Sequence, residues 1–166
     1  MVKRVSISLF ALVVVLGMVA CSKNDDSLSK TITASKKSVP KTLLRSAMSS
    51  VKSTQVGQGQ QDFSGVTIDI LNQEDSDVEY IPTPLVGDEG DAVVSVLTTS
   101  AERIIIQSRE PLLGLCFFVE LNASSAPRYG SSIVGPKHPC GLSPDPKTGS
   151  DFTTSQTTGW STKADK

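Results

Sequence analysis

Two apolar runs decide the fold: Arg103-Ile104-Ile105-Ile106-Gln107 and Leu115-Cys116-Phe117-Phe118-Val119-Glu120-Leu121. Both are rich in β-branched or aromatic residues, which is the composition of buried strands. The run from Ala92 to Leu97 has the same character, and Ala101-Glu102 has the length of a hairpin connection between it and the next run. Further upstream, Val78 to Ile81 predicts a short strand that ends at a proline. Together these runs predict a sheet of short, closely spaced strands.

A helix is expected ahead of the strands, over residues 41–55. Apolar residues recur there at i, i+1, i+4, i+5 and i+8, the pattern of an amphipathic helix, and Pro40 suits its first turn. The run from Val66 to Leu71 is open to two interpretations, a weakly alternating strand or a turn of helix. The order of elements predicts an α+β fold, with one helix on a small antiparallel sheet of about three to five strands. The apolar stripe of the helix consists of Leu43, Leu44, Ala47, Met48 and Val51.

Polar segments flank this α+β domain, which we expect to span residues 40–142. Residues 21–39 are mostly Ser, Thr, Lys and Asp, a composition that predicts a flexible tether. Residues 143–166 predict a mostly disordered tail, from which Phe152 and Trp160 are the side chains expected to contact the domain. Two further segments are expected to be loops: a hairpin loop at 87–91 and an exposed contact loop at 122–139.

The N-terminus has the order of an export signal. Lys3 and Arg4 precede an apolar run over residues 5–15, and Leu16-Gly17-Met18-Val19-Ala20-Cys21 follows. A transmembrane anchor is the alternative, but the apolar stretch of about 16 residues is shorter than the roughly 20 that span a bilayer. The segment ending at Cys21 resembles the lipobox of bacterial lipoproteins, with Met18 in place of the usual leucine.

The lipobox resemblance implies that residues 1–20 are a signal peptide and that Cys21 becomes a lipid-bearing N-terminus. A diacylglyceryl thioether on Cys21 and acylation of the new amine would give two or three chains, which hold a protein in a bilayer where one does not. The expected location is the cell membrane, with the domain outside the cytoplasm. Ser22 follows the cysteine, so the Asp that would favour retention at an inner membrane is absent.

Lipidation of Cys21 leaves an even pair of cysteines, Cys116 and Cys140. Outside the cytoplasm such a pair favours a disulfide, which would stabilise the fold by roughly 3 kcal/mol in the chain-entropy model. A zinc site is disfavoured because the two cysteines and the single histidine, His138, leave a fourth ligand position unfilled.

The domain resembles the headgroup of actinobacterial type IV pilin-like proteins. The segments that carry this resemblance are residues 44–52 for the helix, 63–71 and 78–80 for the link to the sheet, and 94–96, 104–109 and 114–120 for the strands. The chain departs from the family because it has neither a Gly-Phe-x-x-x-Glu processing site nor a long hydrophobic helix. The resemblance therefore implies a surface or accessory protein and does not extend to filament assembly.

Known catalytic and cofactor motifs are missing from the sequence. His138 lies between prolines, no Gly-x-Ser-x-Gly or Ser-x-x-Lys pattern has a credible setting, and Gly57-Gln58-Gly59 follows a helix instead of opening one. We expect no catalytic residues, no cofactor and no nucleic-acid partner. The expected function is non-catalytic, with the membrane as one partner and a possible extracellular protein as another.

Charge is unevenly distributed along the chain. Residues 53–102 contain ten acidic residues and no Lys or Arg, whereas residues 21–52 carry seven basic and two acidic residues. Within the acidic part, Asp75, Asp77 and Glu79 alternate and would share one face of a strand. They are candidate Ca²⁺ ligands, with a second cluster at 88–91, and a small Ca²⁺- or ligand-binding lipoprotein is the alternative function. A solvated acidic face is the favoured interpretation.

Overall fold

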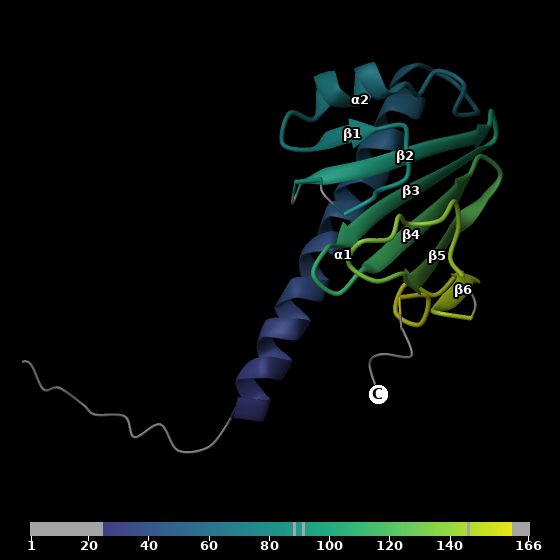
Figure 1. Cartoon of the computed structure of the whole chain (residues 1–166). Helices are drawn as coiled ribbons and strands as arrows, with labels where there is room; N and C mark the ends of the chain where they lie inside the picture. The colour runs from purple at the N-terminus through teal and green to yellow at the C-terminus, as the bar shows by residue number, and fades with distance from the viewer. Residues whose placement is uncertain (1–24, 88, 91, 146, 161–166) are drawn as a thin grey trace, which may run out of the picture.

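The computed structural model describes residues 25–87, 89–90, 92–145 and 147–160, with side chains described from residue 39 onward. A long helix crosses one face of a six-stranded sheet, and a short helix lies beside the sheet edge that the first strand forms (Figure 1). This arrangement is α+β, as the sequence predicts. The elements are α1 (Asp25–Gly57), α2 (Ile68–Glu74), β1 (Glu79–Ile81), β2 (Val93–Ser100), β3 (Arg103–Glu110), β4 (Leu115–Asn122), β5 (Ser125–Ile133) and β6 (Ser150–Thr153).

The strands lie in the sheet in chain order, β1 to β6, and all neighbouring pairs but one are antiparallel. The two-residue connection Ala101-Glu102 joins β2 to β3, which confirms the predicted hairpin. The exception is β1, which runs parallel to β2. The segment 87–91 is therefore part of a crossover between parallel strands, and the predicted hairpin loop there is wrong.

Alternation along β4 divides the core between the two faces of the sheet. Phe117 packs on the side of α1 with Leu44 and Val51. Phe118 packs on the opposite side with Cys116 and Cys140. Successive side chains of a strand point to opposite faces, so this split is the one expected from the sequence. The predicted apolar stripe of α1 is confirmed, because its central residues are buried against the sheet.

The helix α1 begins earlier than the sequence predicts. Residues 25–39, expected as a flexible tether, form its first half and extend beyond the sheet, as the purple end of the ribbon in Figure 1 shows. Pro40 is therefore inside the helix and not in its first turn. Extending a helix from a packed segment costs much less than nucleating one, which accounts for helical structure in so polar a stretch. Within the described residues, no helix is both long and apolar enough to cross a bilayer.

Three other segments also differ from the sequence prediction. The ambiguous run at 66–71 is largely helical and belongs to α2, whose N-cap is Thr67. The segment 122–139, expected as an exposed loop, contains β5, which is held between β4 and β6. The start of the predicted disordered tail forms β6 and a turn that buries Trp160 to 2% exposure. Residues 161–166 lie outside the described part of the chain.

Candidate functional site

The disulfide is the predicted site feature that the structure contains. Cys116, near the start of β4, is bonded to Cys140, and their Cα atoms are 5.8 Å apart. Both residues are buried on the face of the sheet away from α1. The backbone N–H of Cys140 donates to the carbonyl of Leu85, 2.7 Å away, so the bridge also holds the β1–β2 connection. Cys21 and the predicted signal peptide, residues 1–20, lie outside the described residues.

Arg109 ties the loops around the disulfide together. Its guanidinium donates to the carbonyl oxygens of Gly135 at 2.9 Å, Pro136 at 2.8 Å and His138 at 2.6 Å, and more weakly to that of Leu85 at 3.4 Å. Four carbonyl acceptors on one cation fix the ends of two loops against each other. His138 itself is exposed and contributes its backbone to this arrangement.

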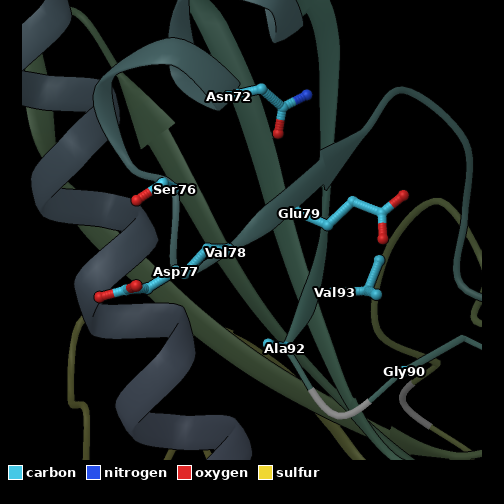
Figure 2. A pocket seen from close by; sticks show the side chains of 8 residues that line it. All are labelled: Asn72, Ser76, Asp77, Val78, Glu79, Gly90, Ala92 and Val93. Carbon is cyan, nitrogen blue, oxygen red and sulfur yellow. The ribbon is translucent and has the colours of Figure 1, made fainter.

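A shallow cleft of about 610 Å³ lies around the first residues of β1 and β2 (Figure 2). It contains two of the three predicted Ca²⁺ ligands, Asp77 and Glu79, together with Asn72 of α2. In Figure 2 the Asp77 and Glu79 carboxylates point away from each other. The prediction that the three carboxylates share one face of a strand is wrong, because only Glu79 belongs to a strand. Asp75 caps α2, and Asp77 lies in the following turn.

Asp75, the third candidate ligand, is directed toward α1. Its carboxylate accepts hydrogen bonds from the Ser50 hydroxyl at 3.3 Å and the Tyr80 hydroxyl at 3.1 Å. Burial raises the pKa of Tyr80 to about 12; the Ser50 hydroxyl opposes this shift, while the negative charge of Asp75 and the hydrogen bond to its carboxylate add to it. These contacts join α1, α2 and β1, so Asp75 is part of the packing between elements.

Asn72 closes the free edge of β1. Its side-chain carbonyl accepts from the backbone N–H of Tyr80 at 2.7 Å, and its amide donates to the Tyr80 carbonyl at 3.1 Å. The side chain thus replaces a neighbouring strand at this residue, which protects an edge that would otherwise offer unpaired backbone groups.

The second acidic cluster is only partly within the described residues, since Asp88 and Asp91 lie outside them. Glu89 is described, and its carboxylate accepts from the backbone N–H groups of Val86 and Gly87, both at 2.6 Å. Partial burial acts to raise the pKa of Glu89, but these N–H groups and the charge of Arg109 outweigh it and hold the pKa below its usual value. Among the described residues, no three acidic, cysteine or histidine side chains converge as metal ligands.

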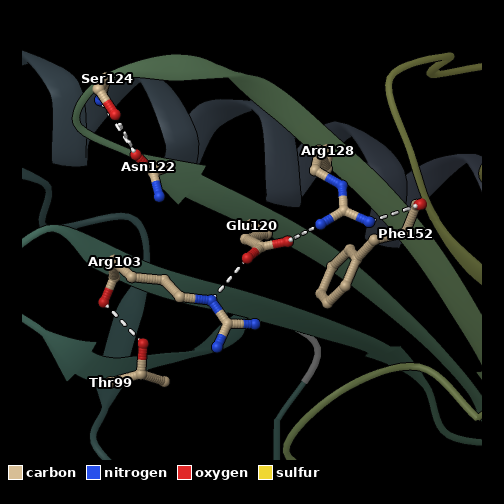
Figure 3. Close-up of polar contacts among 7 residues, drawn as sticks. All are labelled: Thr99, Arg103, Glu120, Asn122, Ser124, Arg128 and Phe152. Carbon is tan, nitrogen blue, oxygen red and sulfur yellow. Dashed lines mark hydrogen bonds and ion pairs between the residues drawn. The ribbon is translucent and has the colours of Figure 1, made fainter.

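A polar cluster occupies the face of the sheet away from α1 (Figure 3). Glu120 on β4 accepts from Arg103 on β3 at 2.5 Å and from Arg128 on β5 at 3.1 Å. Arg128 also donates to the carbonyl of Phe152 and lies over its ring. The arginine side chains are 40% and 48% exposed, so solvent weakens the attraction and the cluster contributes little stability.

Sequence reasoning missed the roles of Arg109 and Glu120. Neither residue belongs to a recognisable motif, and each acquires its partners from segments distant in the chain. The strand register brings Glu120 opposite Arg128, and a register of this kind is not readable from a single strand. The two residues hold strands and loops in place.

No protein-family model matches this chain, and no curated protein and no solved structure is detectably similar to it. Function is therefore inferred from the sequence signals and the contacts described above.

Proposed function

We propose that this protein is a lipid-anchored, extracytoplasmic surface protein that presents a small α+β domain and catalyses no reaction. The observation that carries the proposal is the order of residues 3–21: two basic residues, an apolar run, and Leu16-Gly17-Met18-Val19-Ala20-Cys21. In this proposal, Cys21 bears the lipid and residues 1–20 are removed.

The cysteine pair supports an extracytoplasmic location. Cys116 and Cys140 are joined in the structure, and disulfides persist in oxidising compartments outside the cytoplasm. A small domain with a bridge between a central strand and a surface loop is typical of exported proteins. The two cysteines lie far from the N-terminal segment in the chain, so they support export independently of it.

The arrangement of α1 supports a role in presentation. The first half of the helix separates the sheet from the anchor, and the second half packs on the sheet. The resemblance to pilin-like headgroups adds to this proposal, because a helix that extends beyond its sheet suits a domain presented at a membrane surface. The exposed face around Arg103 and Arg128 is the rigid surface that we propose for contact with an extracellular protein.

The Ca²⁺-binding alternative receives no support from the geometry. Of its three candidate ligands, Asp75 is engaged with α1 and β1, and the remaining two carboxylates diverge. We therefore propose no metal-dependent function for the acidic cleft.

The proposal is tested by expressing the full chain in a bacterium that processes lipoproteins and supplying labelled palmitate. Wild-type protein is expected to incorporate the label and to partition into the detergent phase, and Cys21→Ser is expected to do neither. Ser22→Ala, a neighbouring change of similar size, is the matched control and keeps both properties. Absence of label from wild-type protein, or its presence in Cys21→Ser, would contradict the assignment.

A further inference from the structure

We infer that the projecting half of α1, residues 25–39, lies against the anionic headgroups of the bilayer and acts as a second, electrostatic membrane contact beside the lipid. We call residues 25–39 the stem. The inference rests on the proposed function, since the lipid on Cys21 is what brings the stem to a membrane. The partner of the stem in this inference is the lipid surface.

The length of chain between anchor and stem places them close together. Cys21 is four residues before Asp25, where α1 begins. Four residues span at most about 14 Å even when fully extended. The helix then rises roughly 1.5 Å per residue, so the whole stem is about 22 Å long. Lys30 lies in its first half, and Lys36 and Lys37 lie near its junction with the domain.

The charge of this region fits an anionic surface. Between Ser27 and Gln61 there are six basic residues and no acidic ones, and three of the six belong to the stem. Asp25 and Asp26 are the only acidic residues of the stem, and both are at its first turn. Each Lys or Arg near a negatively charged leaflet adds about 1 kcal/mol of attraction, which is roughly a fivefold increase in partitioning.

Residues 53–102 of the domain have the opposite charge and would be repelled by the same surface. The ten acidic residues at 53–102 include Asp77 and Glu79 in the cleft at the start of β1, which we call the acidic edge together with Glu89 in the neighbouring connection. An anionic bilayer therefore attracts the stem and repels the acidic edge. The two forces together orient the sheet away from the lipid and leave the stem as the contact.

The test uses the chain from residue 21 onward with Cys21→Ser, so that no lipid contributes to binding. We expect this protein to sediment with vesicles of phosphatidylcholine containing about a third phosphatidylglycerol, and to be released by high salt, which shortens the Debye length. Lys36→Gln with Lys37→Gln is expected to lower the partition coefficient roughly 25-fold. Emission from Trp160, the single tryptophan of the chain, verifies that each variant is folded.

Lys52→Gln is the matched control for each single stem variant, Lys36→Gln or Lys37→Gln, because it also removes one positive charge, from an exposed position near the other end of the same helix. It is expected to bind as the parent does. Equal binding to vesicles of pure phosphatidylcholine, or a loss in Lys52→Gln equal to the loss in either single stem variant, would overturn the inference. Because the assay omits the lipid anchor, its failure is distinguishable from failure of Cys21 to be lipidated.

Discussion

At the residue scale, the approach of Gly114 to Gly135 depends on the absence of side chains. Gly114 has a φ of +62°, and a Cβ added there would lie 2.1 Å from the carbonyl carbon of Gly135. Backbone atoms on the other strand end cannot move aside as a flexible side chain can. Glycine is required at this turn for both conformation and space.

Gly114→Ala is therefore expected to destabilise the fold by more than about 1 kcal/mol, through a left-handed alanine and a steric conflict. The measurement is the free energy of unfolding in urea. Gly57→Ala is the control, because Gly57 is the last residue of α1 and has no atom within 4 Å of an added Cβ. Equal stability of Gly114→Ala and wild type would show that the turn is wrongly placed.

Tyr80 gives the protein a specific sensitivity to alkaline pH. Its folded-state pKa of about 12 is higher than the ordinary value of 10, so the unfolded chain loses this proton first as pH rises. The associated stability is fully present below pH 10 and is lost progressively between pH 10 and pH 12. Tyr80→Phe is expected to flatten the stability profile over that range, measured by urea unfolding at each pH. An unchanged slope would contradict the buried placement of the hydroxyl.

At the scale of elements, Trp160 connects the end of the described chain to the core. Its ring contacts Phe117 and Tyr129 edge-on, and Lys41 and Arg45 of α1 lie over its face. The segment after β6 thereby closes one side of the space between α1 and the sheet. The segment 154–160 is short and polar, so we expect Trp160 to supply most of the packing that holds it on the domain.

Trp160→Ala is expected to lower the free energy of unfolding by about 3–5 kcal/mol, the usual cost of removing a large buried aromatic side chain. Circular dichroism in urea measures the effect without relying on tryptophan emission. Leu142→Ala, at a side chain that is 66% exposed, is the control and is expected to change little. A loss below about 1 kcal/mol would mean that the segment 154–160 is not packed as described.

The bond between Cys116 and Cys140 joins β4 to the loop after β5, and its separation of 24 residues sets its expected contribution. Removing both thiols, by Cys116→Ala with Cys140→Ala, is expected to cost roughly 3 kcal/mol. Reduced wild-type protein, which keeps both side chains, should lose a similar amount of unfolding free energy. This comparison separates the contribution of the S–S bond from that of the packed side chains. If reduction leaves the unfolding midpoint unchanged, the bridge contributes no stability.

The sequence predicts β2, β3 and β4 because their own residues are apolar and β-branched or aromatic. It does not predict β5, since Ser125–Ile133 contains Pro127, Gly130 and several serines and is stabilised by the strands on either side. The stem and β6 are missed for the same reason. Each is a polar segment whose structure follows from a neighbouring packed element, and composition alone favours disorder there.

The candidate site is also predictable only in part. The disulfide is predictable from the number of cysteines and the expected export of the chain, and the structure confirms the bond. The carboxylates at 75–79 are not predictable, because a period of two indicates a shared face only if the residues are in one strand. Here the helix end at Glu74 and the turn that follows direct Asp75 toward Ser50 and separate the other two.

At the scale of the whole molecule, the acidic edge is expected to act as a solvated surface and not as a Ca²⁺ site. Millimolar Ca²⁺ should leave the melting temperature unchanged within error, both for wild type and for Asp77→Asn with Glu79→Gln. A calcium-dependent increase in wild type that disappears in the variant would restore the Ca²⁺-binding alternative.

At this scale we propose a molecule with a lipid anchor at Cys21, a charged stem and a disulfide-closed domain outside the cytoplasm. The most direct test is the intact mass of the protein extracted from membranes, measured with alkylation before and after reduction. The account predicts a chain that begins at Cys21, carries two or three acyl chains, and has two further thiols that react only after reduction. A chain that retains residues 1–20 without acylation, or whose Cys116 and Cys140 react without a reductant, would contradict it.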